Sequence, residues 1–436
     1  MRSIWITFGV VMSVVGISGC AAPVTTGNAT PAAHADNDQA DGSIPGLDEA
    51  IRQDPNNAGA FTRRGVAYAR TGQHDRAISD YSEAIRLDPE SAEAFSNRAS
   101  AYVMTGQDDR AIQDLDQAIR INPIYTAAFT TRGSVYAHKG QYDRAIQDND
   151  TAIRFDPNAA LAFYNRGSAY ARKGETGRAI QDYDEAIRLD PKSALAYYNR
   201  GNAQASQGHD DRAIQDYDEA IRLDPNAASA FYNRALAYAR AGQYDRAIKD
   251  DGEAIRLNPN NADAFGNRGL AYAAEGQYDR AIQDYDEAVR LNPKKADAFS
   301  NRGLAYARKG ETDRAIQDYD EAIRLDPYLA EALSNRGIAL ARKGQFDPAI
   351  ADFDRAIRLD PNLADAYRNR GLAYAGRGQH ERAIQDYDLA TTFNPNDATA
   401  LYNRGLAFRA LGQPTSAAGD FAKARELNPT LPPPPD

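Results

Sequence analysis

A proline recurs every 34 residues along almost the whole chain, without any insertion or deletion in the spacing. The positions are Pro55, Pro89, Pro123, Pro157, Pro191, Pro225, Pro259, Pro293, Pro327, Pro361, Pro395 and Pro429. A fixed period of this length is typical of an array in which one supersecondary unit is copied and stacked. The fold therefore has to be explained by one unit, and the function by the positions that differ between copies.

The first part of each copy has the pattern of an amphipathic helix. We number the places of the unit 1 to 34, with place 1 at Ala58 in the first of eleven full copies. In the copy that begins at Ala296, we expect a helix over places 2 to 14. Phe299, Gly303 and Tyr306 recur at helical spacing and share one face of that helix.

The second part of each copy predicts another helix, over places 17 to 30. A glycine such as Gly310 precedes it in every copy, as expected for a left-handed helix stop. Alanines such as Ala315 and Ala322 recur in every copy, and we expect an aromatic residue or leucine, here Tyr319, between them. The small residues allow the helices to approach closely, and Pro327 ends the helical path.

This unit resembles the tetratricopeptide repeat in its period, its small and aromatic places and its proline. The resemblance extends over about residues 47 to 430, and residues 47 to 55 look like a half repeat that covers the first full copy. It implies an all-α fold, a right-handed α-solenoid of about eleven helical hairpins. It also implies that the first helix of each hairpin lines a concave groove that binds other proteins.

Place 7 departs from the family pattern, because it is arginine in all eleven copies and not an aliphatic residue. The place lies close to the buried direction of the first helix, where a guanidinium needs a partner. The only acid present in every copy is the aspartate at place 23. We therefore predict a structural ion pair in each copy, Arg302 with Asp318 in this one. The alternative is a basic stripe for anionic ligands.

The resemblance places candidate binding residues on the groove face of the first helices. A ladder of asparagines at place 6 suits the N–H and C=O groups of an extended peptide, although it could instead join neighbouring repeats. Exposed tyrosines and an apolar row would add contact surface, or the row could be ordinary packing. The candidates are Asn97, Asn165, Asn199, Asn233, Asn267, Asn301, Asn335, Asn369, Asn403, Tyr164, Tyr198, Tyr232, Leu270 and Leu304.

Charge and motifs argue against several other functions. The net charge is −10, with Arg and Asp interleaved, whereas nucleic-acid binding needs a concentrated basic face. The five histidines are scattered, and no metal-binding or nucleophile motif occurs. We expect no catalytic residue, no metal and no cofactor, and the oligomeric state is left open.

The N-terminus predicts export. Residues 1 to 19 combine Arg2, an apolar stretch and small residues, as in a signal peptide. Ile17 to Cys20 resemble a bacterial lipobox, which implies a lipid on Cys20 and a palmitate-type acyl anchor. In an envelope with an outer membrane, the resemblance favours its periplasmic face. Residues 20 to 45 predict a disordered tether, residues 46 to 430 the array, and residues 431 to 436 a proline-rich tail.

These features together predict a lipid-anchored scaffold of the bacterial cell envelope. We expect it to bind extended segments of partner proteins in its groove and to reach the membrane through Cys20. The alternative is an accessory protein for glycan binding or polysaccharide export that uses the same groove.

Overall fold

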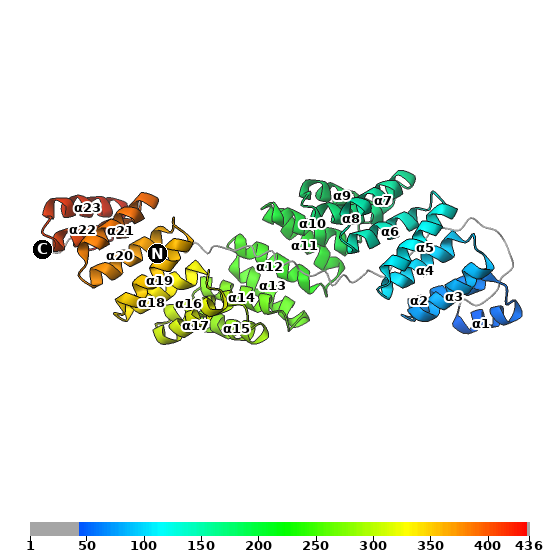
Figure 1. Ribbon diagram of the computed structural model, residues 1–436, viewed down its shortest axis with the longest axis horizontal. Coiled ribbons are helices and arrows are strands. Elements are labelled where there is room, and N and C mark those ends of the chain that lie inside the picture. Colours follow the sequence, from blue (N-terminus) through cyan, green and yellow to red (C-terminus); the bar gives the residue numbers. More distant parts are fainter. Residues whose placement is uncertain (1–42, 434–436) are drawn as a thin grey trace. The chain divides into compact units, whose positions relative to one another are not determined.

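The computed structural model describes residues 43–433, and this part of the chain consists of helices and connecting turns, without a strand. It divides into two compact units, one up to Gln207 and one from Gly208 (Figure 1). Unit 1 contains α1 (Ile44–Gln53), α2 (Ala58–Arg70), α3 (His74–Leu87), α4 (Ala92–Met104), α5 (Asp108–Ile121), α6 (Thr126–His138), α7 (Tyr142–Phe155), α8 (Ala160–Arg172), α9 (Thr176–Leu189) and α10 (Ala194–Ser206).

Unit 2 contains the remaining helices of the described part. They are α11 (Asp210–Leu223), α12 (Ala228–Arg240), α13 (Tyr244–Leu257), α14 (Ala262–Ala274), α15 (Tyr278–Leu291), α16 (Ala296–Arg308), α17 (Thr312–Leu325), α18 (Ala330–Arg342), α19 (Phe346–Leu359), α20 (Ala364–Gly376), α21 (His380–Phe393), α22 (Ala398–Ala410) and α23 (Pro414–Leu427). The predicted signal peptide, Cys20 and most of the tether, as well as the end of the proline-rich tail, lie outside the described residues.

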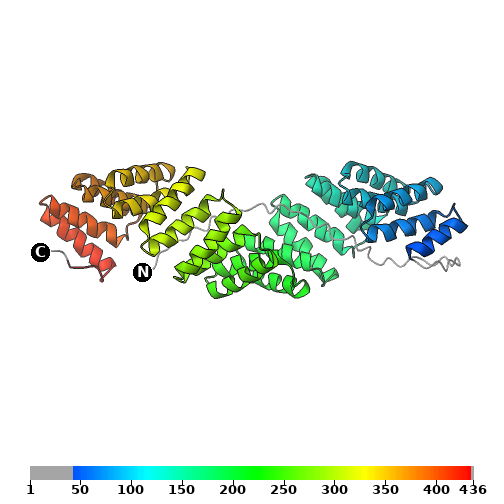
Figure 2. The same ribbon diagram turned by 90° about the horizontal axis from the view of Figure 1, so that it is seen from below.

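The helices stack in sequence order within each unit, as Figure 2 shows. The two helices of a copy pack against each other, and the second helix then packs against the first helix of the next copy. Successive first helices, such as α16 and α18, also contact each other. Each unit is therefore a tetratricopeptide-type α-solenoid with the first helices in one layer and the second helices in the other.

The predicted helix stop is confirmed at place 15. The glycine there has a positive φ in all eleven copies, between 72° and 84°, a conformation in which a Cβ would clash with the backbone. The first helix begins and ends one place earlier than expected, at Ala296 and Arg308 in the central copy. The second helix, Thr312–Leu325, has the predicted bounds.

The array begins with α1, and it begins slightly earlier than the predicted boundary at residue 46. Ser43 caps this helix by accepting a hydrogen bond from the backbone N–H of Gly46 at 3.3 Å, and Pro45 lies in the first turn. Both residue types favour a helix start. Leu47 is 1% exposed, so the half repeat buries its apolar side chain.

The core between the two helices of a copy depends on a match between places 8 and 24. A Cβ on Gly303 would lie 2.9 Å from Cε1 of Tyr319, too close for an alanine to fit without a shift. Place 8 is glycine in all eight copies that carry an aromatic residue at place 24. The first of the two copies with alanine at place 8 pairs Ala99 with Leu115, so the missing ring makes room for the methyl group.

The expectation of an aromatic residue or leucine at place 24 is wrong in two copies. Asn149 and Asp251 occupy this place and are 0% and 1% exposed. Asn149 donates a hydrogen bond to the carbonyl oxygen of Ala145 at 2.7 Å. In both residues the Oδ1 atom is buried without a hydrogen-bond partner. The repeat pattern thus tolerates a polar side chain in its core at two points.

Candidate functional site

The arginine at place 7 joins three helices in the structure. Arg302 on α16 donates hydrogen bonds from Nε and Nη2 to Oδ2 and Oδ1 of Asp318 on α17, at 2.8 and 2.7 Å. Its Nη1 donates to Oδ1 of Asp286 on the preceding helix α15, at 2.7 Å. Arg302 and Asp318 are 17% and 9% exposed, whereas Asp286 is 52% exposed. The arginine therefore ties its own hairpin together and joins it to the preceding copy.

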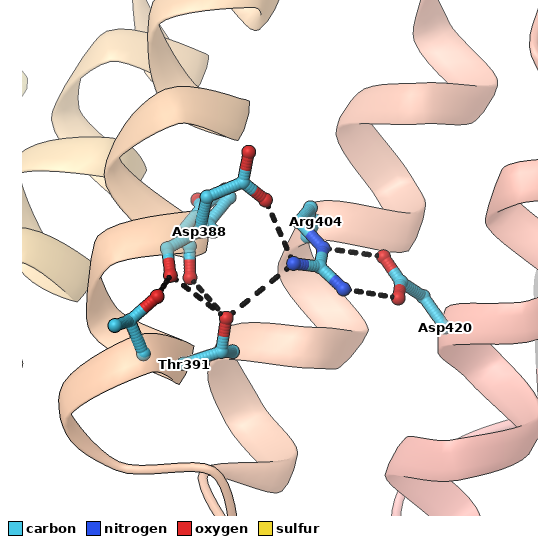
Figure 3. A network of polar contacts seen from close by, with 6 residues as sticks. Asp388, Thr391, Arg404 and Asp420 are labelled. Carbon is cyan, nitrogen blue, oxygen red and sulfur yellow. Dashed lines mark hydrogen bonds and ion pairs between the residues drawn. The ribbon is translucent and has the colours of Figure 1, made fainter.

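The same arrangement recurs along both units. Figure 3 shows it for Arg404, which binds Asp420 in its own copy and Asp388 and Thr391 in the preceding one. Five further arginines each bind one aspartate of the preceding helix and one of the following helix: Arg64 (Asp48, Asp80), Arg132 (Asp116, Asp148), Arg166 (Asp150, Asp182), Arg234 (Asp218, Asp250) and Arg336 (Asp320, Asp352). Arg370 does the same with Asp354 and Asp386.

Aromatic rings pack against the guanidinium group. The Cζ atom of Arg302 lies 5.4 Å from the ring centroid of Phe299, and Arg64 lies 5.5 and 5.9 Å from Phe61 and Tyr68. Hydrogen bonding to Asp318 raises the pKa of Arg302 above its ordinary value. These contacts occupy the arginines within the fold, which argues against a basic stripe for anionic ligands.

The asparagine ladder has two different environments. In unit 1, Nδ2 of Asn199 donates a hydrogen bond to the hydroxyl oxygen of Tyr164 in the preceding copy, at 2.9 Å. Burial raises the pKa of Tyr164, so the hydroxyl is neutral at physiological pH. Tyr164 also packs against Tyr183, with ring centroids 6.0 Å apart. This asparagine and this tyrosine therefore join neighbouring repeats, the structural role that the sequence left open.

In unit 2, the asparagines of three consecutive copies lack such a partner. The preceding copy carries Gly266, Ser300 or Ser334 where unit 1 has Tyr164, so no ring reaches the amide. The side-chain amides make no hydrogen bond within residues 43–433, although the residues are half-buried. They are Asn301, Asn335 and Asn369, on α16, α18 and α20.

The apolar row lies next to these amides and serves partly as packing. Leu270 and Ile338 contact buried core clusters of unit 2. Leu304 is half-buried, and Leu372 is 39% exposed. Ser300 and Ser334 are buried at 7% and 8%, so place 5 contributes little surface here. The surface is instead built from places 2, 6 and 9, with Asp297 exposed at its edge.

We call this surface the amide face, and define it by Asn301, Asn335 and Asn369 with Leu304 and Leu372. The other candidate asparagines lie outside this definition, although Asn403 on α22 follows Asn369 in the next copy and its side-chain amide also makes no hydrogen bond within residues 43–433. Asn97 and Asn165 are half-buried on α4 and α8 of unit 1, and Asn403 is half-buried on α22. Asn267 has a buried Nδ2 without a hydrogen-bond partner. Tyr198, Tyr232 and Asn233 each take part in interactions of their own.

Two structural features were missed in the sequence, although its pattern contains both. The aspartate of the preceding copy that binds most of these arginines recurs at place 25, but it is not present in every copy and therefore does not stand out as an invariant acid. The match between places 8 and 24 is visible only when the two columns are compared. Among residues 43–433, no cluster of three or more His, Cys, Asp or Glu side chains could hold a metal ion. No helix of this part has the length and apolar character needed to cross a membrane.

Comparison with known families shows the repeat along most of the chain. A family model described as TPR repeat matches residues 68–106, 133–174, 167–208, 201–242, 239–276, 269–310, 339–377 and 376–412. Models described as tetratricopeptide repeat match residues 47–79, 92–125, 296–329 and 399–430. These models indicate no enzymatic family. No curated protein matches the chain.

Several solved structures are similar. The Cut9–Hcn1 hetero-tetramer of APC/C shares 15% identity over 89% of this chain and 90% of that one, with a TM-score of 0.50. YrrB, described as a TPR protein with an unusual peptide-binding site, shares 29% identity over 42% of this chain and 95% of its own, with a TM-score of 0.37. MamA shares 31% identity over 38% of this chain and 96% of its own, with a TM-score of 0.36.

The family matches cover well over half of the chain and coincide with the hairpins of both units. Arrays of this kind are in general non-catalytic scaffolds for protein–protein interaction. The chain belongs to the tetratricopeptide repeat family.

Proposed function

We propose that this protein is a lipid-anchored scaffold that binds extended segments of partner proteins on the amide face of unit 2. The observation that carries the proposal is the set of unengaged amides of Asn301, Asn335 and Asn369, one in each of three consecutive repeats. Each amide offers two donors and an acceptor, which match the N–H and C=O groups of a peptide backbone.

The spacing of the repeats suits an extended chain. Packed helices lie about 8–10 Å apart, and α16, α18 and α20 contact one another in sequence order. An extended peptide advances about 3.3 Å per residue, so one amide would meet the ligand about every third residue. Leu304 and Leu372 beside the amides would contact apolar side chains of the same segment.

The membrane anchor is a separate part of the proposal and is supported by the sequence alone. Residues 1–19 have the composition of a signal peptide, and Cys20 is the single cysteine of the chain. Several acyl chains at one site would hold the protein firmly, because each buried methylene contributes about 0.8 kcal/mol. The partners would then be proteins of the cell envelope, reached from the outer membrane if the host has one.

Site-specific cross-linking tests the binding proposal. A photoreactive amino acid replaces Asp297 or Glu331, which are exposed at place 2 of consecutive repeats in unit 2. The matched control carries it at the exposed Gln317 on α17. We expect both test positions to cross-link one segment of a single partner, at residues about three apart because of the helix spacing.

The control at Gln317 should not cross-link that segment. Cross-linking of a polysaccharide without any protein would contradict the proposal and favour the glycan-binding alternative. Equal cross-linking of the same protein segment from Gln317 would also contradict it, because binding would then not depend on the first helices.

A further inference from the structure

The contact between the sixth and seventh copies departs from the repeat pattern at several adjacent places. We call it the α13–α14 junction and define it by Asp251 and Gly252 on α13 and by Asn267 and Arg268 on α14. At the place of Asp251, eight of the other copies have tyrosine or phenylalanine, one has leucine and one has asparagine. All four residues belong to unit 2, so the junction lies within one compact body.

Asp251 has a buried carboxyl group. It is 1% exposed, and its Oδ1 has no hydrogen-bond partner. Burial raises the pKa of Asp251 well above its ordinary value. Arg268 on α14 opposes this effect, whereas Asp250 on α13 and Asp284 on α15 add to it. On α12, Arg234 binds Asp250 at 2.6 and 2.8 Å, and Arg240 binds Asp210 of α11.

Because residue 252 is glycine, Arg268 has one aspartate partner instead of two. Arg268 keeps both hydrogen bonds to Asp284, at 2.8 and 2.7 Å. Its Nη1 lies 3.7 Å from the position of a Cβ on Gly252, where most copies carry an aspartate. Within residues 43–433, Arg268 is the only place-7 arginine without a hydrogen bond to the preceding copy. Beside it, Nδ2 of Asn267 is also buried without a partner.

We propose that unit 2 opens first at the α13–α14 junction, and that ionisation of Asp251 controls how often it opens. In the closed junction burial favours the neutral carboxyl, because a buried charge without hydrogen bonds is strongly disfavoured. In the open junction the same carboxyl reaches water and ionises readily. The proposal goes beyond ligand binding, and it concerns the edge of the surface that carries the amide face.

The direction of the pH effect follows from linkage. Because the pKa of Asp251 is raised in the closed state, the closed junction binds a proton that the open junction releases. Its stabilisation is complete below the ordinary pKa of an aspartate and is lost as the pH rises through the closed-state pKa. Over that range the opening constant can rise by up to about tenfold per pH unit for one proton.

Hydrogen exchange of the full chain between pH 5 and 8, corrected for intrinsic rates, tests the proposal. Peptides of α13 and α14 are compared with those of α15 and α16. There, Tyr285 and Asp286 hold the equivalent places, and Arg302 makes hydrogen bonds to both of its aspartates. We expect α13–α14 to exchange at least tenfold faster at pH 8, and its opening to increase with pH more steeply than that of α15–α16. Equal protection and equal pH dependence in the two regions would overturn the proposal.

Two variants separate the ionisation from the missing packing. Asp251→Asn removes the titrating group, so the additional pH dependence of α13–α14 should vanish whatever its absolute exchange rate. The double variant Ala235→Gly with Asp251→Tyr restores the glycine–aromatic match and should bring protection to the level of α15–α16 at every pH. Persistence of the pH dependence in Asp251→Asn, or faster exchange in a folded double variant, would overturn the proposal.

Discussion

At the scale of single residues, the fold depends on matched pairs of places. Glycine at place 8 and an aromatic ring at place 24 fit together because the ring occupies the volume of the missing side chain. Alanine at place 8 with leucine at place 24 is another pair that fits, as in Ala99 and Leu115. Packing in protein interiors is dense enough that one methyl group at such a contact changes stability.

Gly303→Ala should therefore destabilise the protein by about 1–3 kcal/mol, because the new methyl group overlaps the ring of Tyr319. Adding Tyr319→Leu should recover part of the loss by imitating the natural pair. Gly266→Ala is the matched control, since its Cβ would meet nothing within 4 Å. Urea unfolding with circular dichroism gives the values. A loss in Gly266→Ala as large as that in Gly303→Ala would refute the overlap.

The ion pair at place 7 provides a second residue-scale prediction. Arg302→Leu removes all three donors and leaves the buried Asp318 without its partner, which should cost about 3–5 kcal/mol. Arg86→Leu is the control, because its bridge to Glu83 is exposed and exposed bridges contribute little to stability. Thermal unfolding compares the two variants. An unchanged or raised melting temperature for Arg302→Leu would show that the pair does not stabilise the array.

At the scale of helices, most of the structure could be predicted because the same signals occur eleven times. Gly310, the invariant alanines and Pro327 define both helices of a copy to within one residue. The aspartate that binds the arginine of the next copy could not be assigned from one copy alone, because Asp286 and Arg302 belong to different repeats. The free amides of Asn301 and Asn335 depend on what the preceding copy places beside them.

The half repeat α1 leads to a prediction at this scale. Leu47 is buried, and Asp48 binds Arg64 of α2 at 2.8 Å. Leu47→Ala should weaken this end by about 2–5 kcal/mol and accelerate hydrogen exchange in α2. Arg52→Ala, at a residue whose side chain is 72% exposed, should leave exchange in α2 unchanged. Equal exchange in α2 for both variants would mean that α1 does not protect the array.

At the scale of the whole molecule, the proposal combines an interaction scaffold with an anchor at Cys20. Radioactive palmitate should label the wild-type protein when it is produced in a bacterial host. Cys20→Ser should abolish the label and release the protein from the membrane fraction, because no other cysteine is present. Undiminished labelling of Cys20→Ser would exclude the anchor while leaving the binding face untouched.

The sequence predicted candidate asparagines for a binding surface, but not which of their amides have hydrogen-bond partners within the fold. The asparagines look alike along the chain, yet Asn199 is engaged by Tyr164, whereas Asn301, Asn335 and Asn369 have no partner among the described residues. This difference arises from contacts between repeats, and a single repeat does not contain it. It concentrates the proposed function in α16, α18 and α20.

The most direct test of the central claim is the affinity of the full chain for the cross-linked partner segment, measured with a fluorescent synthetic peptide. The triple variant Asn301→Ala, Asn335→Ala and Asn369→Ala removes three hydrogen bonds of about 0.5–1.5 kcal/mol each, so the affinity should fall at least about tenfold while the helix content stays unchanged. Asn199→Ala, at the amide that Tyr164 already engages, should bind like the wild type. An unchanged affinity of the folded triple variant would contradict the proposed role of the amide face.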